Sequence, residues 1–516
     1  MALNAISKLI ILLFVACSFS TCHDNNFNTN HELSLDYYEK LSDKAYRFTK
    51  WKINENIGQI IKNDHDTISS DYYARSHYLG TQTLIWVTRN GVTPQADTLL
   101  TYINSVKSIG FSPERFFASQ IEKDLERMRR MNFDVINDIN TVAVRLDYNL
   151  TKAYLRYVMG QRYGFINPSK VFNRLDRDME DTVNVRFRHL YDVQTQHLGE
   201  AGYVKLLKKI PKDSVAPYLR DVEPKGVLYK RLKSMLLYSE GADRDRILVN
   251  MERCRWRQND YPYNHNKYVV VNIPSYELIA VDGDDVQEMK VVNGNIKTKT
   301  PLLNSHITRM DINPKWIIPQ SIVRKDIAAH AGNVDYFHSR NYYITERKTG
   351  QRIDPSIVSY DALRSGVYRV TQEGGEGNVL GRIIFRFANN FAIYLHDTST
   401  RSAFGRENRS VSHGCIRVER PYDLAEFLLS DKSEVLLDKL RYSMSVNTHD
   451  KVDDEGNIIS PQIDKSRLIY SVKIDPQIPV FITYQTIYQM PDGQIRHYND
   501  VYGYDNVILQ RINSFR

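Results

Sequence analysis

Residues 412–418 read Ser-His-Gly-Cys-Ile-Arg-Val, and residues 391–396, shortly upstream, read Phe-Ala-Ile-Tyr-Leu-His. Side chains alternate along the upstream stretch, which is typical of a β-strand with one buried face. On that strand Tyr394 and His396 share the face that points away from the aliphatic residues. The pattern predicts a β domain with a polar site beside the strand.

The downstream stretch places His413, Cys415 and Arg417 on one side of an extended segment. A thiol with an ordinary pKa is mostly protonated near neutral pH, whereas a neighbouring histidine lowers that pKa and supplies the thiolate nucleophile. Gly414 permits a tight backbone, so the N–H groups of Gly414 and Cys415 can point at a developing oxyanion. We therefore interpret Cys415 as a nucleophile that a neighbouring histidine, His396 or His413, activates.

The same atoms are zinc ligands in other proteins, so a metal site was weighed for His396, His413 and Cys415. No further Cys or His lies nearby in the sequence to complete a tetrahedral site. The sequence also has no obvious metal or nucleotide motif. We therefore predict that the protein uses neither a metal nor any other cofactor.

Length and composition indicate a globular protein of two or three domains, because 516 residues with 42% hydrophobic content can bury a large core. The 69 Lys and Arg residues exceed the 61 Asp and Glu residues only slightly, and no dense basic run stands out. The charge pattern therefore gives no reason to expect nucleic-acid binding. It suits an anionic polymer such as the cell wall, or a solvated surface with no partner.

The N-terminus resembles an export leader over residues 1–22. Lys8 precedes an apolar run at 9–16, which is too short to span a bilayer as a helix. Cys17 follows this run directly, as a lipidated cysteine does in a bacterial lipoprotein. Lipidation of Cys17, cleavage near Ser20 and lipidation of Cys22 all remain open. The leader predicts export to the periplasm, with a lipid anchor as one outcome.

If the leader is set aside, Cys254 and Cys415 are the cysteines of the mature chain, and no disulfide framework is expected. Ile247, Met251 and Cys254 have the spacing of one helical face. We therefore interpret Cys254 as a core residue and Cys415 as the reactive cysteine.

The sequence pattern changes from helical to β-rich near residue 260. Residues 30–260 have helical patterns, one of which starts at Ser112-Pro113 with Phe117, Ile121 and Leu125 on one stripe. Residues 266–516 contain short β-rich runs punctuated by Gly and Pro. Within them we predict an inserted lid at about 326–363, a surface loop at about 447–465, and a terminal hairpin formed by 480–488 and 494–498.

These residues resemble the L,D-transpeptidases, in the large form that has a helical scaffold before the catalytic domain. The strongest match is Tyr394-Leu395-His396-Asp397-Thr398 followed by 412–419, with 19 residues from His396 to Cys415. Supporting stretches are 313–316, 377–381, 389–390, 423–425 and the junction 250–256. A small peptidoglycan-binding insertion that relatives often carry is missing here. The resemblance implies an α+β chain, with a mainly helical N-terminal scaffold and a β-rich catalytic domain that carries a lid.

The resemblance also implies a reaction. Cys415 would attack the diaminopimelate carbonyl of a peptidoglycan tetrapeptide stem and release D-alanine, with His396 as the base. An acceptor amine would then take the acyl group and cross-link the wall. Carbapenems are expected to inhibit such an enzyme covalently.

Further roles follow for the neighbouring residues. His413 would line the site, and Arg417 would pair with a stem carboxylate or, alternatively, with Glu419. Tyr394 would line the groove or merely pack. Ser412 is expected next to the substrate. A backbone carbonyl, such as that of Ser412, is expected to orient the imidazole, because Asp397 should point to the other face.

Two other functions remain open. The same acyl-enzyme could be resolved by water, which would make the protein an L,D-carboxypeptidase or endopeptidase. A non-catalytic wall-binding lipoprotein is the alternative from another class, and the complete set of His396, His413 and Cys415 argues against it.

Overall fold

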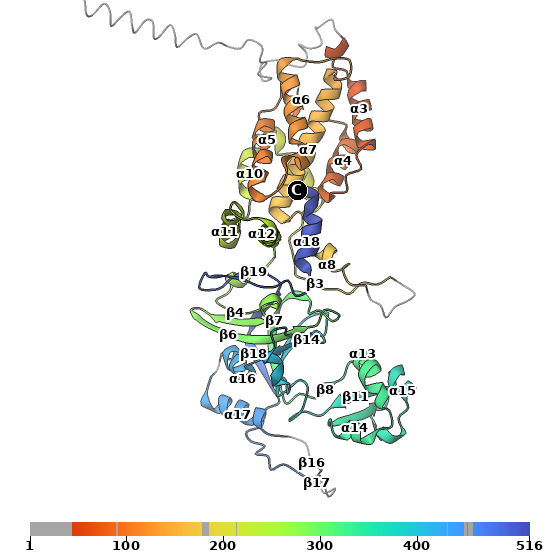
Figure 1. Ribbon diagram of the computed structural model, residues 1–516, viewed down its shortest axis with the longest axis vertical. Helices are drawn as coiled ribbons and strands as arrows, with labels where there is room; N and C mark the ends of the chain where they lie inside the picture. The colour runs from red at the N-terminus through yellow and green to blue at the C-terminus, as the bar shows by residue number, and fades with distance from the viewer. Residues whose placement is uncertain are drawn as a thin grey trace, which may run out of the picture. The chain divides into compact units, whose positions relative to one another are not determined.

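The computed structural model describes residues 44–88, 91–177, 185–212, 214–430, 432–447, 451–452 and 458–516, so the leader and Cys17 lie outside the described residues. The chain divides into two compact units (Figure 1). The first comprises Met1–Ile166, Gln196–Arg257 and Ile508–Arg516, and the second comprises Asn167–Thr195 and Gln258–Val507. No helix in the described ranges is long and apolar enough to cross a membrane.

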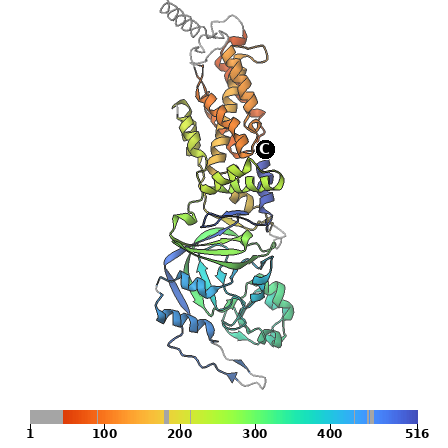
Figure 2. The ribbon, with the colours of Figure 1, turned by 60° about the vertical axis from the view of Figure 1, so that its left-hand side comes forward.

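The first unit is a helical bundle built around α7 (Ile139–Tyr163), which is buried on most sides. Asp138 caps this helix, because its carboxylate accepts the N–H groups of Asn140 and Thr141. Figure 2 shows the long helices of the bundle side by side. The helices that contact α7 are α3 (Lys50–Lys62), α4 (Ser69–Thr81), α5 (Gln95–Ser105), α6 (Ala118–Arg130), α10 (Val215–Val222) and α12 (Gly241–Arg255). The bundle also contains α9 (Glu200–Leu207) and α11 (Val227–Leu236), which packs on α12.

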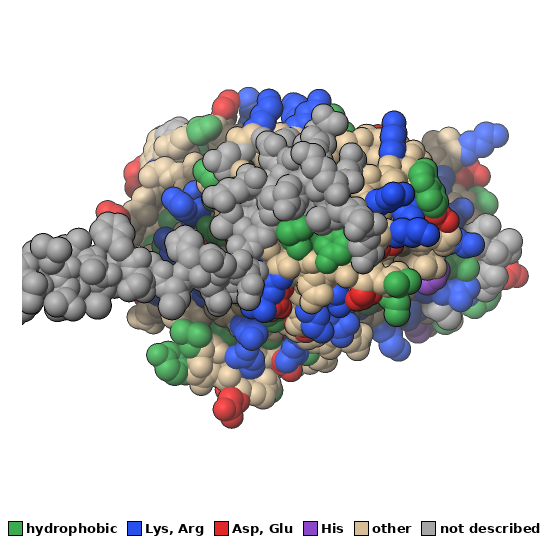
Figure 3. All heavy atoms as spheres, turned by 90° about the horizontal axis from the view of Figure 1, so that it is seen from above, with side chains coloured by type: hydrophobic (Ala, Val, Ile, Leu, Met, Phe, Trp, Pro, Cys, Tyr) green, Lys and Arg blue, Asp and Glu red, His purple; other side chains and the backbone are tan. Residues whose placement is uncertain are grey.

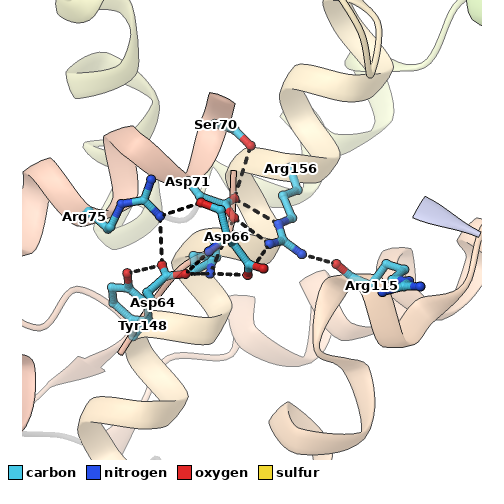
Figure 4. A network of polar contacts seen from close by, with 9 residues as sticks. Asp64, Asp66, Ser70, Asp71, Arg75, Arg115, Tyr148 and Arg156 are labelled. Carbon is cyan, nitrogen blue, oxygen red and sulfur yellow. Dashed lines mark hydrogen bonds and ion pairs between the residues drawn. The ribbon is translucent and has the colours of Figure 1, made fainter. Parts of the chain in front are cut away.

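A network of charged side chains is buried in this bundle, where α7 meets α4 and the loop before it (Figure 4). Lys152 and Arg156 on α7 form ion pairs with Asp66 and Asp71, and Lys152 also pairs with Asp64 at 2.9 Å. Buried charges are tolerated when each is paired and hydrogen-bonded, as these are. The network ties α7 to the loop before α4.

Two expectations for the helical region are corrected. The helix predicted from Ser112 begins as a single 3-10 turn at Pro113–Phe116, and α6 starts only at Ala118 because Phe117 adopts a left-handed φ of 62°. Cys254 on α12 is partly rather than fully buried. Burial still raises the pKa of its thiol to about 12, so this cysteine is unreactive at neutral pH.

The second unit is built on one large sheet, whose strands run in the order β12-β13-β15-β6-β5-β4-β18-β7-β3. Strand β12 also pairs with β7, so the sheet closes on itself like a barrel. The strands are β3 (Tyr191–Asp192), β4 (Lys267–Asn272), β5 (Glu277–Asp282), β6 (Asp285–Gly294), β7 (Leu302–Ile312), β12 (Ile383–Phe387), β13 (Leu395–His396), β15 (Ile416–Val418) and β18 (Ser471–Thr483), with β14 (Ser410–Ser412) beside β6.

The core of this unit follows from runs of β-branched residues. Val269, Val270 and Val271 on β4 are each almost fully buried, because strands lie on both sides of β4 and side chains cover both faces. Helices α16 (Pro421–Leu428) and α17 (Glu434–Ser445) follow β15 in sequence. The short β13 and β15 lie next to each other in the sheet, and this pairing forms the site described below.

The insertion is larger than predicted. Its small sheet has the order β10-β9-β11-β8 and runs from β8 (Trp316–Ile317) to β11 (Tyr368–Gln372), around the predicted 326–363. It has its own core, with Ile344 and Val370 paired across β9 (Tyr342–Glu346) and β11. Strand β11, which follows the predicted lid, therefore belongs to the insertion and not to the large sheet. The remaining elements are α13 (Gln320–Ile322), α14 (Val334–His338), β10 (Arg352–Ile353) and α15 (Tyr360–Ser365).

Two further boundaries differ from those predicted. The terminal hairpin consists of β19 (Ile487–Gln489) and β20 (Ile495–His497), whereas residues 480–483 belong to β18 in the large sheet. The loop at 447–465 contains a short ribbon of β16 (Lys451–Val452) and β17 (Ile458–Ile459). The described chain also contains helices α8 (Pro168–Phe172) and α18 (Tyr504–Ile512). A small two-stranded sheet is formed by β1 (Val87–Thr88) and β2 (Gly91–Val92).

Candidate active site

Cys415 lies on a tight loop between β14 and β15. Gly414 has a φ of 121°, which only glycine adopts readily, and a Cβ there would otherwise meet no close neighbour. The Ser412 hydroxyl accepts the Gly414 N–H at 3.1 Å and donates to the Cys415 carbonyl at 2.6 Å. The loop is thus closed by its own hydrogen bonds immediately before the cysteine.

A second loop, after β6, holds the cysteine loop from outside. The Thr300 hydroxyl accepts the Gly294 N–H at 2.9 Å and donates to the Gly414 carbonyl at 2.8 Å. The Thr298 hydroxyl donates to the Ser412 carbonyl at 3.0 Å. Thr300 is fully buried, so both of its hydrogen bonds are shielded from water.

Tyr394 lies beside the thiol of Cys415. Strands β13 and β15 are parallel, with Leu395 opposite Ile416, and the Ile416 N–H donates to the Tyr394 carbonyl at 3.1 Å. Burial raises the pKa of the Cys415 thiol to about 11, while hydrogen bonds from Tyr394 and the charge of Arg417 act in the opposite direction. The thiol itself points toward the Ala392 carbonyl, with 4.0 Å between sulfur and oxygen.

His396 lies two residues after Tyr394 on β13, directly opposite Arg417 on β15. Burial and, to a smaller extent, the Arg417 charge lower the pKa of His396 to about 3. The Asp397 and Leu380 carbonyls act in the opposite direction, because they favour the charged ring. The Nδ1 atom hydrogen-bonds the Asp397 carbonyl, which can only accept, so Nδ1 carries the proton. The other ring nitrogen is therefore free of a proton and can act as a base.

The imidazole and the thiol are not hydrogen-bonded to each other among the described residues. Both groups are neutral in this state, since the thiol pKa lies far above that of the imidazole. The expectation that a backbone carbonyl orients the imidazole is confirmed, but this carbonyl is that of Asp397 and not that of Ser412. The Ser412 carbonyl is occupied by Thr298 and by Asn295, and the Asp397 carbonyl takes the orienting role.

The carboxylate of Asp397 is directed away from the imidazole. It accepts hydrogen bonds from Arg401 at 2.7 Å and from the Arg382 N–H at 2.8 Å. A Cβ on Gly381 would lie 2.3 Å from the Asp397 side chain, which explains the glycine at 381. Asp397 is therefore a structural anchor beside the histidine.

The guanidinium of Arg417 has no acidic partner in the described part of the chain. Its Nε is buried without a hydrogen bond, and Glu419 accepts the Lys290 N–H instead. Burial lowers the pKa of Arg417, and Arg406 adds to this effect, whereas Cys415 opposes it. An unpaired, partly buried guanidinium is suited to a carboxylate ligand.

The other predicted residues take different positions. His413 is exposed on the loop. Ser412 is buried and its hydroxyl is used inside the loop, while its contact with the substrate stays a prediction. Of the two expected oxyanion donors, the Gly414 N–H is occupied by Ser412, whereas the Cys415 N–H has no partner among the described residues. No group of three or more potential metal ligands occurs in the described ranges.

Sequence reasoning missed Thr298 and Thr300, which lie more than 100 residues from Cys415 in the chain. No local signal marks these threonines. It also missed the direct contact of Tyr394 with the thiol, although alternation placed Tyr394 beside His396, where the two rings lie 5.8 Å apart. The strand expected at 391–396 is limited to Leu395–His396, because Ala392 takes a φ of 53°.

A cysteine on a glycine-dependent loop, beside a buried histidine that can accept a proton, is an arrangement suited to a cysteine nucleophile. Residues 266–446 match the family of L,D-transpeptidase catalytic domains, and residues 69–236 match a scaffold domain. The chain therefore carries an L,D-transpeptidase catalytic domain, with a scaffold domain before it. A Haemophilus influenzae protein named "Putative L,D-transpeptidase" is 28% identical over 312 residues, which are 60% of this chain and 59% of that relative.

Proposed function

We propose that this protein is a peptidoglycan L,D-transpeptidase that uses Cys415 as its nucleophile. The Cys415 sulfur attacks the diaminopimelate carbonyl of a tetrapeptide stem, and a C–S bond forms. The C–N bond to the terminal D-alanine breaks, and its amine leaves with a proton. An acceptor amine then attacks the thioester, a new amide forms, and the sulfur regains its proton.

The observation that carries this proposal is that, within the described residues, the Cys415 N–H and the buried Nε of Arg417 have no hydrogen-bond partner, while both residues border the same thiol. An acyl-transfer site needs a donor for the oxyanion and a group that binds the substrate beside the nucleophile. Arg417 would pair with a stem carboxylate, for which its planar fork is suited. Tyr394 and the exposed His413 would line the bound stem.

The protonation states support His396 as the base. Its unprotonated nitrogen can take the thiol proton and return a proton to the leaving amine. The thiol holds its proton at rest, so we propose that the transfer follows substrate binding, when the sulfur turns from Ala392 toward the imidazole. Gly414 could join Cys415 as an oxyanion donor once its N–H leaves Ser412.

The site of action would be the cell envelope. The leader at 1–22 supports export to the periplasm, and Cys17 is the candidate for lipid attachment, which would hold the enzyme at a membrane. Such a position would bring the enzyme to its substrate, the stem peptides of the wall.

Intact-mass measurement after incubation with a carbapenem tests the nucleophile. We expect one covalent adduct on the parent protein and none on Cys415→Ala, with Cys254→Ala as the matched control that keeps the adduct. Absence of the adduct on folded parent protein would count against an activated Cys415.

Product analysis on purified muropeptides tests the reaction. Cross-linked dimers together with released D-alanine are expected for transfer. Tripeptides alone would show that water resolves the acyl-enzyme and that the protein is an L,D-carboxypeptidase. A Cys415→Ala variant with full activity would overturn the enzyme assignment itself.

A further inference from the structure

One turn of the helical unit presents two aliphatic side chains to solvent. Val135 is 93% exposed and Ile136 is 83% exposed, between α6 and α7. The Asp134 carboxylate accepts the N–H groups of Ile136 at 2.8 Å and Asn137 at 2.7 Å, so the turn is held in shape. Two adjacent aliphatic residues on an ordered turn are a costly exposure in water.

Trp51 lies near this turn, at the start of α3, and is 63% exposed. The Lys52 ammonium is 5.9 Å from the Trp51 ring centroid and 3.8 Å from the Asp138 carboxylate, which caps α7 just after the turn. The Trp51 ring and the turn therefore belong to one end of the helical unit. We call Trp51, Val135 and Ile136 the apolar tip.

Basic side chains border the apolar tip. Lys44, Arg47 and Lys50 are exposed, and none of them forms an ion pair with an acidic side chain in the described residues. The Tyr46 hydroxyl donates to the Met131 carbonyl at 2.7 Å, which holds this segment against the turn. Figure 3 looks onto this end and shows apolar and basic side chains next to one another.

We propose that this end of the helical unit docks on the surface of a bilayer that contains anionic lipid. Aliphatic residues and tryptophan suit the boundary between headgroups and acyl chains, and cations next to them suit anionic headgroups. An anionic wall polymer would engage the cations but would leave Val135 and Ile136 in water. The described chain also starts at this end, and only residues 17–43 separate it from Cys17. That length spans at most about 90 Å, so a lipid on Cys17 would hold the apolar tip near the same bilayer.

The proposal is tested with the full chain on vesicles of phosphatidylcholine and phosphatidylglycerol whose acyl chains carry bromine, which quenches tryptophan at short range. The chain has four tryptophans, of which Trp86 and Trp256 are buried and Trp316 is partly buried. We expect quenching that the Trp51→Phe variant loses. The N-terminal segment is present in every variant, so differences report on the apolar tip itself.

The double variant Val135→Ser with Ile136→Ser should weaken the quenching interaction at least about tenfold. Replacement of Lys44, Arg47 and Lys50 by Gln should weaken it about fivefold for each cation removed, and added salt should have a similar effect. The matched control is Ile357→Ser with Val435→Ser, two exposed residues of the second unit, which should change nothing.

Two results would overturn the proposal. One is that Trp51 is not quenched, or is quenched equally in the parent and in the double variant. In either case, the thermal unfolding of the parent and of the variants must be the same. The other is binding to purified wall sacculi that requires the cations, without quenching on vesicles, which would identify a wall polymer as the partner.

Discussion

Tyr394 and Cys415 are neighbours across the pairing of β13 with β15, and the tyrosine hydrogen-bonds the thiol. His396 lies two residues further along and faces Arg417. Tyr394 therefore lowers the pKa of the resting thiol, while His396 is in its neutral form. In the proposed mechanism, the residue that contacts the sulfur is therefore different from the residue that takes its proton.

The variant Tyr394→Phe should raise the pKa of the Cys415 thiol, because the lost hydrogen bond favours the thiolate. A hydrogen bond to a charged group is worth about 1.5–3 kcal/mol, so the rate of alkylation by iodoacetamide near neutral pH should fall by about tenfold or more. The pH dependence of alkylation, followed by mass spectrometry of the Cys415 peptide, measures this change.

The control for Tyr394→Phe is a high-pH measurement, at which the variant and the parent should reach the same alkylation rate. A rate that stays lower at every pH would mean that Tyr394 only shapes the loop. The raised pKa of Cys254, to about 12, keeps that cysteine from obscuring the result.

The variant Arg417→Lys should weaken donor binding more than chemistry. Lysine keeps the positive charge that acts on Cys415 and His396 but loses the planar fork that matches a carboxylate. We expect KM for a tetrapeptide stem to rise by about tenfold or more, with a smaller change in kcat and in the alkylation rate. A donor whose carboxylates are amidated serves as the control, since the variant and the parent should treat it alike. Equal KM for the natural donor would contradict the role.

The variant Thr300→Val should loosen the cysteine loop. It leaves the Gly294 N–H and the Gly414 carbonyl unpaired in a buried place, at a cost of about 2 kcal/mol or more in the free energy of unfolding. A displaced nucleophile should also slow carbapenem acylation by about 100-fold. Thermal unfolding and the acylation rate measure the two effects. Thr300→Ser keeps the hydroxyl and should restore both, and its failure to do so would assign the effect to lost packing.

Several parts of the site could be predicted from sequence because their signals are local. The alternation of side chains predicted that Tyr394 and His396 share one face of their strand. The glycine before Cys415 predicted a tight loop. The change from β-rich to less regular sequence indicated the insertion and the β runs beside it. The sequence did not tell which sheet each strand joins, and Val370 lies in the sheet of the insertion. The helical region before them was visible from its periodicity.

The remaining features depend on contacts between distant residues. The register of β13 against β15 decides that Tyr394, rather than His396, contacts the thiol. Thr300 reaches Gly414 only through the fold. The burial that moves the pKa of Cys415 upward and that of His396 downward has no local signature either.

The ion network of the helical unit should make stability depend on acid. Burial alone would raise the pKa of Asp64, but hydrogen bonds from Tyr148 and Lys152 outweigh it and lower the pKa from 3.8 to about 2. Because the folded pKa lies below the unfolded value, the stabilisation is fully present above pH 4 and is lost as the pH falls toward 2. It amounts to about 2 kcal/mol. Asp64→Asn should therefore lower the free energy of unfolding by at least about this amount at pH 7, and the difference from the parent should shrink between pH 4 and 2. Urea unfolding at several pH values measures this dependence, with Asp221→Asn as an exposed control that should change little. A difference that is the same at pH 7 and pH 2 would show that Asp64 acts through packing and not through its charge.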